Sequence, residues 1–235
     1  MTLFETLKDR CRPEWEAYIR HEFVEKLGEG TLPIDVFRDY LIQDFHFLVQ
    51  FARANALAAF KSRTLADFTA AHQATGAIIA ETGLHLRLTE RWGIPRAELE
   101  AAAEKQATVA YTRYVLDAGM SGDLLDLHVA LAPCTIGYAE IGALLQPRLA
   151  DHGDVSGSGS GDGVGRDVAE HPYGEWIAEY SGEEFTAASA AAIAQLDQLA
   201  AGGLSDQRLD ELTEVFSTAT RLEADFWQQA LDSVG

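Results

Sequence analysis

The spacing of apolar residues along the chain predicts an all-helical protein. After Pro33, apolar side chains recur mostly three or four residues apart, which places them on one face of a helix together with Asp44. Similar patterns predict further helices over 13–28, 64–92, 97–119, 123–148, 172–180, 183–201 and 206–233. Sustained period-2 alternation with β-branched residues does not occur in the sequence, so we expect an all-α bundle of seven or more helices.

Turn and capping residues mark several of the predicted boundaries. The segment Thr31–Pro33 predicts a helix start with Pro33 in the first turn, and Gly93–Pro95 separates two further helices. Ser121 is the predicted cap of the helix that carries Cys134.

One segment departs from the helical pattern. Residues 151–167 are rich in Gly, Ser and Asp and can bury very little, which predicts a flexible acidic insertion. A domain boundary is the alternative. Because the part that follows is short and rich in alanine, it makes a poor separate core, and we expect a single domain over residues 1–235.

The charge balance narrows the possible partners. The chain has 235 residues with 18 Lys and Arg against 37 Asp and Glu, a net charge of −19. This balance argues against binding to nucleic acid or to an anionic membrane surface. Apolar residues make up 47% of the chain, which excludes the composition of a disordered protein. The N-terminal segment lacks the shape of a signal peptide and no run of about 18 apolar residues occurs, so we expect a cytoplasmic protein.

The positive charge is carried mostly by arginine, since lysine occurs only at positions 8, 26, 61 and 105. Acid-rich, lysine-poor surfaces suit a salt-rich cytosol, where screening suppresses self-repulsion. This composition suggests a halophilic source, and an ordinary acidic bacterial protein remains the alternative.

Cys134 is the first candidate for chemistry. It lies between Pro133 and Gly137 in an apolar helical stretch, where a local kink would let a side chain leave the packed helix face. Tyr138 follows four residues later on the same face and is placed to orient the thiol. The thiol is either a nucleophile or a small buried apolar group. The other cysteine, Cys11, is too distant in sequence to form a typical ligand pair with it, and we expect neither a disulfide nor a zinc site.

Asp44 lies on the apolar face of its predicted helix, between Tyr40 and Phe47. A buried carboxylate needs a partner. Asp44 is therefore either an anchor for a polar ligand in an aromatic pocket or one half of a salt bridge.

Glu223 shares a predicted helix face with Phe226 and Trp227. Among aromatic side chains its pKa would be raised, which suits a general acid. The alternative is a solvated glutamate beside Arg221.

Glu81 and His85 form an E-x-x-x-H pair on one helix face. Two such residues can contribute to a di-iron site in a helical bundle, but a full site needs more inward-facing ligands, and only His128 and scattered acids are at hand. A structural hydrogen bond between the two is the alternative.

Several short segments, taken in order, resemble the TenA (thiaminase II) family. They span nearly the whole chain except the insertion, and they comprise His21–Val24, Gly30–Pro33, Phe37 with Tyr40–Asp44, Phe51–Ala54, Ala110–Thr112, Cys134 with Gly137 and Tyr138, Pro172–Tyr173 with Trp176, Ile177 and Tyr180, and Glu223 with Phe226 and Trp227.

The resemblance implies a haem-oxygenase-like all-α fold, usually a homotetramer, that binds no haem or metal. It implies hydrolysis of the C–N bond on the methylene at carbon 5 of 4-amino-5-aminomethyl-2-methylpyrimidine. The products would be ammonia and hydroxymethylpyrimidine, which feeds thiamin synthesis. Many members of the family also cleave thiamin.

The resemblance also implies roles for individual residues. Cys134 would be the nucleophile that adds to the pyrimidine ring, which lets the exocyclic amine depart. Glu223 would protonate that amine and later help to activate water. Asp44 would hold the ring nitrogen and the 4-amino group.

Four aromatic residues complete the implied site. Tyr111 would pack on the ring, Tyr138 would hydrogen-bond near the thiol and Tyr173 would close the pocket. Phe47 is a departure, because several members of the family carry a tyrosine there, and the missing hydroxyl removes one hydrogen bond near the thiol and the acid.

Two functions of other classes remain as alternatives. One is a metal-dependent oxidase on the same fold, built on Glu81 and His85. The other is a non-catalytic pyrimidine-binding or regulatory protein.

Overall fold

The computed structural model describes residues 1–153 and 171–234. The described residues form α-helices and one short 3-10 helix, and no strand occurs in these two ranges. The all-α class predicted from the sequence is confirmed. The elements are α1 (Leu3–Arg10), α2 (Arg12–Ile19), α3 (Glu22–Gly28), α4 (Ile34–Lys61), α5 (Leu65–Arg91), α6 (Arg96–Ala101), α7 (Gln106–Ser121), α8 (Leu124–Gly153), α10 (Gly174–Tyr180), α11 (Glu183–Leu199), α12 (Asp206–Leu231) and η1 (Asp232–Val234).

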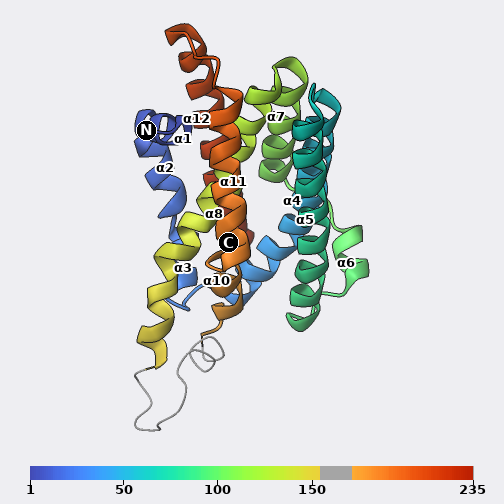
Figure 1. Cartoon of the computed structure of the whole chain (residues 1–235). Helices are drawn as coiled ribbons and strands as arrows, with labels where there is room; N and C mark the ends of the chain where they lie inside the picture. Colours follow the sequence, from blue (N-terminus) through green and yellow to red (C-terminus); the bar gives the residue numbers. More distant parts are fainter. Residues whose placement is uncertain (154–170, 235) are drawn as a thin grey trace.

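Two long helices organise the bundle. Helix α4 pairs with α5 along one side of the molecule, and α8 packs against α7, α10, α11 and α12 (Figure 1). The short helices α1 to α3 lie on the opposite side from the α4–α5 pair. One continuous apolar core fills the space between these layers.

By length and composition alone, helix α8 could cross a membrane over Leu124–Leu149. This stretch was not identified from the sequence, because it is not a continuous run of apolar residues. Most of its apolar stretch is buried inside the protein, with Leu127, Val129 and Ile141 fully buried. Its apolar side chains therefore serve the core of the bundle.

Side-chain caps define where several helices begin. Thr2 accepts a hydrogen bond from the backbone N–H of Glu5 at 3.1 Å, and the Glu5 carboxylate accepts one from the Thr2 N–H at 2.7 Å. This capping box starts α1, a helix that the sequence patterns did not predict. Ser205 caps α12 in a similar way through the N–H of Arg208 at 3.1 Å.

The helix predicted over 13–28 is wrong in one respect, since the structure has two helices there, α2 and α3. The chain breaks at Arg20 and His21, where the His21 ring accepts a hydrogen bond from the N–H of Phe23 at 3.3 Å and so caps α3. The apolar spacing continues through the break, because both short helices bury their side chains in the same core.

The helix predicted over 97–119 is also two helices, α6 and α7. The cause is the buried side chain of Gln43, which donates to the carbonyl of Ala103 at 3.0 Å and accepts from the N–H of Lys105 at 2.8 Å. Gln43 also accepts a hydrogen bond from the Thr108 hydroxyl at 2.7 Å. These bonds hold the connecting segment in a non-helical conformation.

Two boundary assignments need correction as well. Pro33 is the residue that precedes α4 and does not lie in its first turn. Ser121 ends α7, and its hydroxyl donates to the carbonyl of Asp117 at 2.7 Å. The start of α8 is capped instead by Asp123, whose carboxylate accepts from the N–H of Leu125 at 2.8 Å.

The predicted insertion begins inside a helix, because α8 continues through Gly153. Residues 154–167 of that insertion lie outside the described residues.

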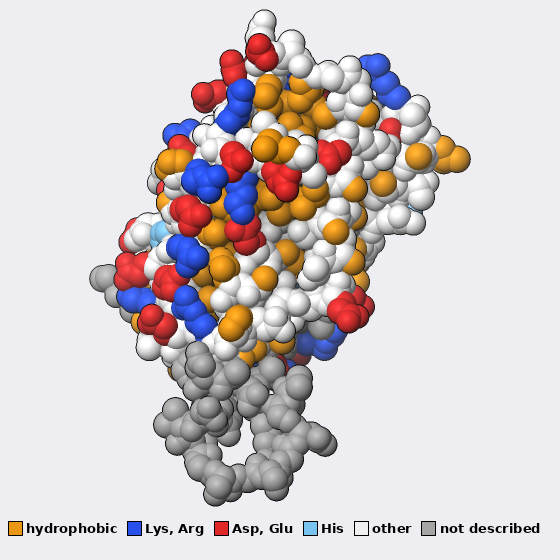
Figure 2. Space-filling view, turned by 60° about the vertical axis from the view of Figure 1, so that its left-hand side comes forward, with side chains coloured by type: hydrophobic (Ala, Val, Ile, Leu, Met, Phe, Trp, Pro, Cys, Tyr) orange, Lys and Arg blue, Asp and Glu red, His pale blue; other side chains and the backbone are white. Residues whose placement is uncertain are grey.

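Many of the cations on the surface form ion pairs with acids. On the face shown in Figure 2, Lys and Arg side chains alternate with Asp and Glu side chains along one strip. Among the ion pairs are Lys26 with Glu22 at 2.6 Å and Arg10 with Asp210 at 2.6 Å. The positive charge on that face is thus dispersed among acids, which is unlike the footprint of a nucleic-acid binder.

Candidate active site

Two carboxyl groups predicted as site residues are buried inside the bundle. Asp44 of α4 is 3% exposed and Glu223 of α12 is 1% exposed. Burial raises the pKa of each to about 8, and the charge of Asp44 contributes to the rise at Glu223. The interpretation of Glu223 as a solvated edge residue is therefore wrong. Its neighbour Arg221 faces outward and donates to Thr218 at 3.1 Å.

Glu223 is held by Tyr111 of α7. The Tyr111 hydroxyl donates to Glu223 Oε1 at 2.8 Å, a contact that lowers the pKa of the carboxyl against the larger effect of burial. The Tyr111 ring stacks on Phe47 with centroids 5.2 Å apart. Phe47 also packs on Phe226 at 5.8 Å. Glu223 thus accepts a hydrogen bond from Tyr111 beside a stack of aromatic rings.

The Cys134 thiol belongs to the same region. Cys134 is half-buried in α8, and neither of the two cysteines forms a disulfide. The negative charges of Glu223 and Cys134 both help to raise the pKa of the Tyr111 hydroxyl, after the larger effect of burial. The thiol, the Glu223 carboxyl and the Tyr111 hydroxyl therefore interact electrostatically.

Tyr18 of α2 is a site residue that the sequence did not reveal. Its hydroxyl donates to the carbonyl of Pro133 at 3.3 Å, next to Cys134. A Cβ on Gly137 would lie 2.3 Å from the Tyr18 ring, so only glycine admits the ring this close to α8. Burial raises the pKa of Tyr18 well above its ordinary value, with further contributions from Glu223 and Cys134. Tyr18 therefore lies with Tyr111 and Glu223 in the region around the Cys134 thiol.

A second layer of hydroxyl groups surrounds Asp44. Tyr40 hydrogen-bonds the Asp44 carboxyl, which lowers its pKa against the effect of burial. The Tyr40 hydroxyl accepts a hydrogen bond from the Trp176 indole at 3.1 Å, and Tyr138 and Tyr180 also hydrogen-bond to it. The predicted site residue Tyr138 is therefore linked to Asp44 through Tyr40.

Tyr173 lies in a neighbouring aromatic layer. Its ring stacks on Trp92 with centroids 5.7 Å apart and packs on Phe37 at 4.6 Å. Its hydroxyl donates to the carbonyl of Leu32. Tyr173 and Trp176 line a groove of about 360 Å³. Tyr173 is therefore placed at a surface opening, one layer outside the hydroxyls that meet Asp44.

His85 of α5 is directed at Asp44. Its Nδ1 lies 3.3 Å from Asp44 Oδ2 and its Nε2 lies 2.8 Å from the carbonyl of Leu41. The side chain of Glu81, the other half of the predicted pair, lies outside the described residues. Among the side chains that the structure does describe, no group of three or more His, Cys, Asp or Glu is arranged to hold a metal ion. The described geometry therefore gives the di-iron interpretation no support.

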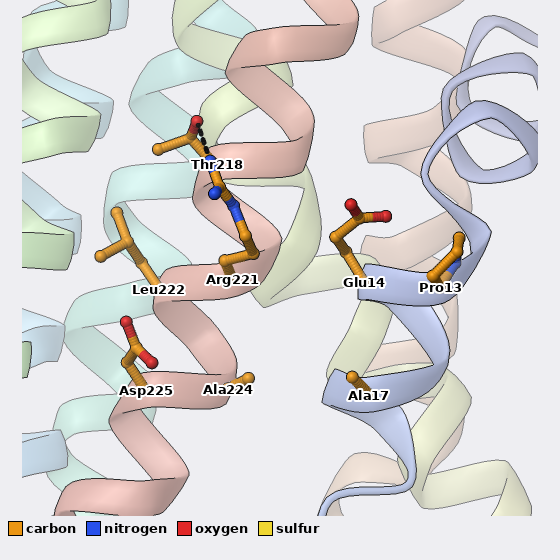
Figure 3. A pocket seen from close by; sticks show the side chains of 8 residues that line it. All are labelled: Pro13, Glu14, Ala17, Thr218, Arg221, Leu222, Ala224 and Asp225. Atoms are coloured by element: carbon orange, nitrogen blue, oxygen red, sulfur yellow. Dashed lines mark hydrogen bonds between the residues drawn. The ribbon is translucent and has the colours of Figure 1, made fainter.

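A surface groove of about 560 Å³ lies between α2 and α12, and its lining does not include Asp44, Cys134 or Glu223. Figure 3 shows its walls, with Glu14 and Ala17 of α2 facing Arg221 and Ala224 of α12. Helix α12 thus carries Glu223 on its buried face and the groove on its outer face.

Comparison with known proteins places this geometry in context. A family model described as the TENA/THI-4/PQQC family matches residues 8–233. The chain is 36% identical over 233 residues to an uncharacterized protein of Haemophilus influenzae, covering 98% of this chain and 99% of that one. It is 35% identical over 234 residues to an aminopyrimidine aminohydrolase of Halalkalibacterium halodurans, covering 98% and 96%. A solved structure from Silicibacter sp. TM1040, named a TenA family transcription regulator, superposes with a TM-score of 0.84 at 40% identity, covering 97% of this chain and 96% of that chain.

Proposed function

Because the chain belongs to the TENA/THI-4/PQQC family, we propose that it is an aminopyrimidine aminohydrolase. Its substrate would be 4-amino-5-aminomethyl-2-methylpyrimidine and its products hydroxymethylpyrimidine and ammonia, with thiamin as a further substrate. The observation that carries the proposal is the thiol of Cys134 in electrostatic contact with Tyr111, which itself hydrogen-bonds a buried, protonated Glu223.

The thiol is the proposed nucleophile. In the thiolate form, with its proton already lost to solvent, the sulfur of Cys134 bonds to a ring carbon of the pyrimidine, and the displaced electron pair expels the amine from the methylene on carbon 5. Water then adds to that methylene, and the sulfur leaves as the aromatic ring is restored. A direct displacement of the amine would lack the electron push that the sulfur supplies.

Glu223 is the proposed acid and base. With a pKa of about 8 it holds a proton at neutral pH. Since Tyr111 donates to Oε1, the carboxyl proton is left to Oε2, from which it passes to the departing amine to give ammonia. The resulting carboxylate takes a proton from the attacking water, which returns the site to its starting state.

The remaining predicted residues receive binding roles. Asp44 binds the ring nitrogen and the 4-amino group, and Tyr138 supports it through Tyr40. Phe47 and Tyr111 supply the stacked aromatic wall against which a flat ring packs. Tyr173 lines the groove of about 360 Å³, and we propose that the substrate enters through this groove.

We also propose that the protein works in the cytoplasm as a homotetramer, with no cofactor and no nucleic-acid or membrane partner. Large apolar side chains are exposed along α4 and α5, among them Phe60 at 84% and Leu65 at 81%. A patch of this kind suits burial against other copies of the chain. Light scattering on the purified protein tests the assembly.

The central experiment measures ammonia release from the aminomethylpyrimidine. We expect the wild type to release ammonia and Cys134→Ser to lose at least about a hundredfold in kcat, because serine is a far weaker nucleophile at neutral pH. Cys11→Ser is the matched control, since the Cys11 thiol is buried and faces the carbonyl of Thr213 at 3.6 Å. Equal activity in wild type and Cys134→Ser would refute the nucleophile.

A pyrimidine-binding regulatory protein is the second candidate, because a structurally similar relative is named a transcription regulator. It would bind aminopyrimidines in calorimetry without releasing ammonia. Turnover by the wild type would exclude a purely binding role.

A further inference from the structure

One indole in the buried core carries a hydrogen-bond donor that has no acceptor. Trp227 of α12 is fully buried, and no described group accepts from its Nε1–H. The buried indoles of Trp15 and Trp176 do donate, to Glu140 at 3.2 Å and to the Tyr40 hydroxyl at 3.1 Å. Buried donors in native proteins are almost always paired, because an unpaired one costs free energy. The Nε1–H of Trp227 therefore points to an acceptor that the described residues do not supply.

Trp227 lies among the residues of the candidate site. It follows Glu223 by four positions on α12, which places both side chains on one face of that helix. Its ring packs on the rings of Tyr40 and Tyr138, with centroids 5.4 Å and 5.2 Å away. Tyr40 hydrogen-bonds the Asp44 carboxyl, and Tyr138 hydrogen-bonds Tyr40. The indole thus adjoins both the proposed acid and the hydroxyl groups that surround Asp44.

The stacking contacts of Trp227 hold the indole without using its donor. The ring of Phe23 stacks on it at 4.7 Å with an interplanar angle of 13°, and the ring of Tyr18 at 6.3 Å with an angle of 14°. Rings that are nearly parallel cover the face of an indole, whereas the N–H bond lies in the plane of the indole. The donor is therefore held in a fixed orientation by its neighbours and is still able to bind an acceptor.

The proposed substrate has an acceptor to which the proposed mechanism assigns no donor. A 4-aminopyrimidine has two ring nitrogens, and only N3 is bonded to the carbon that bears the amino group. Asp44 can therefore bind a ring nitrogen and the amino group together only through N3. With a pKa of about 8, its carboxyl carries a proton at neutral pH that one oxygen donates to N3, while the other oxygen accepts from the amino group. N1, the other ring nitrogen, keeps a lone pair without a partner.

We propose that Trp227 is a ligand-binding residue whose Nε1–H donates a hydrogen bond to N1 of the pyrimidine. The unpaired donor of the protein then meets the unpaired acceptor of the substrate. Because an indole N–H only donates, it selects a ring with a lone pair at this position and rejects a ring with C–H or N–H there. A donor at N1 also draws electron density from the ring carbons bonded to it, which favours attack by a thiolate. This inference rests on the proposed function, since it concerns the same site.

The central test removes the nitrogen from the ligand and the N–H from the protein, singly and together. The ligands are 4-amino-5-hydroxymethyl-2-methylpyrimidine and its analogue with C–H in place of N1, and Kd is measured by calorimetry. We expect the wild type to bind the analogue about ten- to a hundredfold more weakly, because C–H leaves the buried donor unpaired. In Trp227→Phe we expect this ratio to fall about tenfold or more. The two ligands differ in basicity for both proteins alike, so that difference cancels in the cycle.

Two further variants make the comparison specific. Trp15→Phe is the control, because it removes a buried indole that already donates to Glu140, and it should keep the ratio of the wild type. Since Trp227→Phe also opens space in the core, Trp227→3-benzothienylalanine is the second test. That side chain keeps the shape of the indole and replaces its N–H with sulfur, so its ratio should fall as in Trp227→Phe. A folded Trp227 variant of either kind that keeps the ratio of the wild type overturns the proposal.

A spectroscopic measurement on the wild type tests the hydrogen bond itself. The chain has four tryptophans, and the Trp227 indole peak in 1H–15N spectra is the one that persists in Trp15→Phe, Trp92→Phe and Trp176→Phe. We expect its proton to move downfield when the parent pyrimidine binds and to stay in place when the analogue binds. An unmoved proton, or one that moves upfield, overturns the inference even in a protein that releases ammonia. A wild type that binds no aminopyrimidine refutes the proposed function, and this hydrogen bond with it.

Discussion

Replacement of Gly137 by alanine should disturb the site without touching any group that reacts. Gly137 lies three residues after Cys134 on α8 and faces the ring of Tyr18. A Cβ there would lie 2.3 Å from one ring carbon, 2.7 Å from the hydroxyl oxygen and 2.9 Å from the carbon that bears it. All three atoms belong to one rigid, fully buried ring, so the ring must move as a unit or α8 must shift.

The magnitude follows from the overlap. Ordinary contact begins at 3.4 Å, so the ring must retreat by roughly 1 Å, and overpacking of this kind costs about 1–3 kcal/mol. For a chain of this length each kcal/mol lowers Tm by about 2–4 °C. The shift would also lengthen the 3.3 Å hydrogen bond from Tyr18 to the Pro133 carbonyl, beside the thiol.

The assay is thermal unfolding together with ammonia release, and the control is Gly76→Ala. Gly76 lies within α5, and a Cβ there meets no other atom within 4 Å. Because alanine has the higher helix propensity, the control should gain about 0.5–1 kcal/mol. We expect Gly137→Ala to lose both stability and kcat, and Gly76→Ala to keep its activity.

A double-mutant cycle with Tyr18→Leu isolates the overlap, because leucine vacates the space that the new methyl group needs. The cost of Gly137→Ala should shrink in the Tyr18→Leu background. Gly137→Ala that is as stable as the wild type, or whose cost is unchanged by Tyr18→Leu, would show that the close approach of α2 to α8 does not restrict this position.

Three further predictions follow from the buried acids and the surface charge. Burial raises the pKa of Glu223 to about 8, so between pH 4.5 and pH 8 the unfolded chain binds fewer protons and stability falls as the pH rises. Glu223→Gln should flatten this fall in the free energy of unfolding measured by denaturant titration, and parallel curves would contradict the burial of the charge. Tyr111→Phe removes a hydrogen bond that lowers the pKa of Glu223, so the alkaline limb of the rate–pH profile should move to higher pH while kcat drops about tenfold or more; an unmoved limb would mean that another group titrates. With a net charge of −19, Tm should rise as KCl goes from low to molar concentration, and a Tm independent of salt would show that self-repulsion is already balanced.

The helical class could be predicted from the sequence because the spacing of apolar residues indicates which face each helix buries. Two breaks between helices could not be predicted. The break at His21 depends on a ring nitrogen that caps the next helix, and the break before α7 depends on a buried Gln43 that bonds across from another helix. In both places a side chain contact overrides a helical pattern that continues on either side.

Candidate site residues could be predicted from the sequence where a polar side chain lies on an otherwise apolar helix face. Asp44 and Glu223 stand out as acids on apolar helix faces, and the structure buries both. Tyr18 gives no such signal, since on a short helix it resembles its buried neighbours Trp15 and Ile19. His85 was singled out for a spacing within its own helix, whereas its described partners, Asp44 and the Leu41 carbonyl, both belong to α4.

The origin of the site residues in distant parts of the chain affects how the protein is made. Tyr18 of α2 stacks on Trp227 of α12 with ring centroids 6.3 Å apart, and the N–H of Leu3 donates to Asp197 at 2.7 Å. Contacts between the two ends of a chain form late, because they require closure of the longest loops. A ribosome that has released everything up to Asp206 has therefore delivered the thiol and both tyrosines at positions 18 and 111, but neither the acid nor the indole that packs against them. Until α12 emerges, the nascent chain lacks the helix face that completes its apolar core, so we expect the bundle to close only once that helix is free of the ribosome.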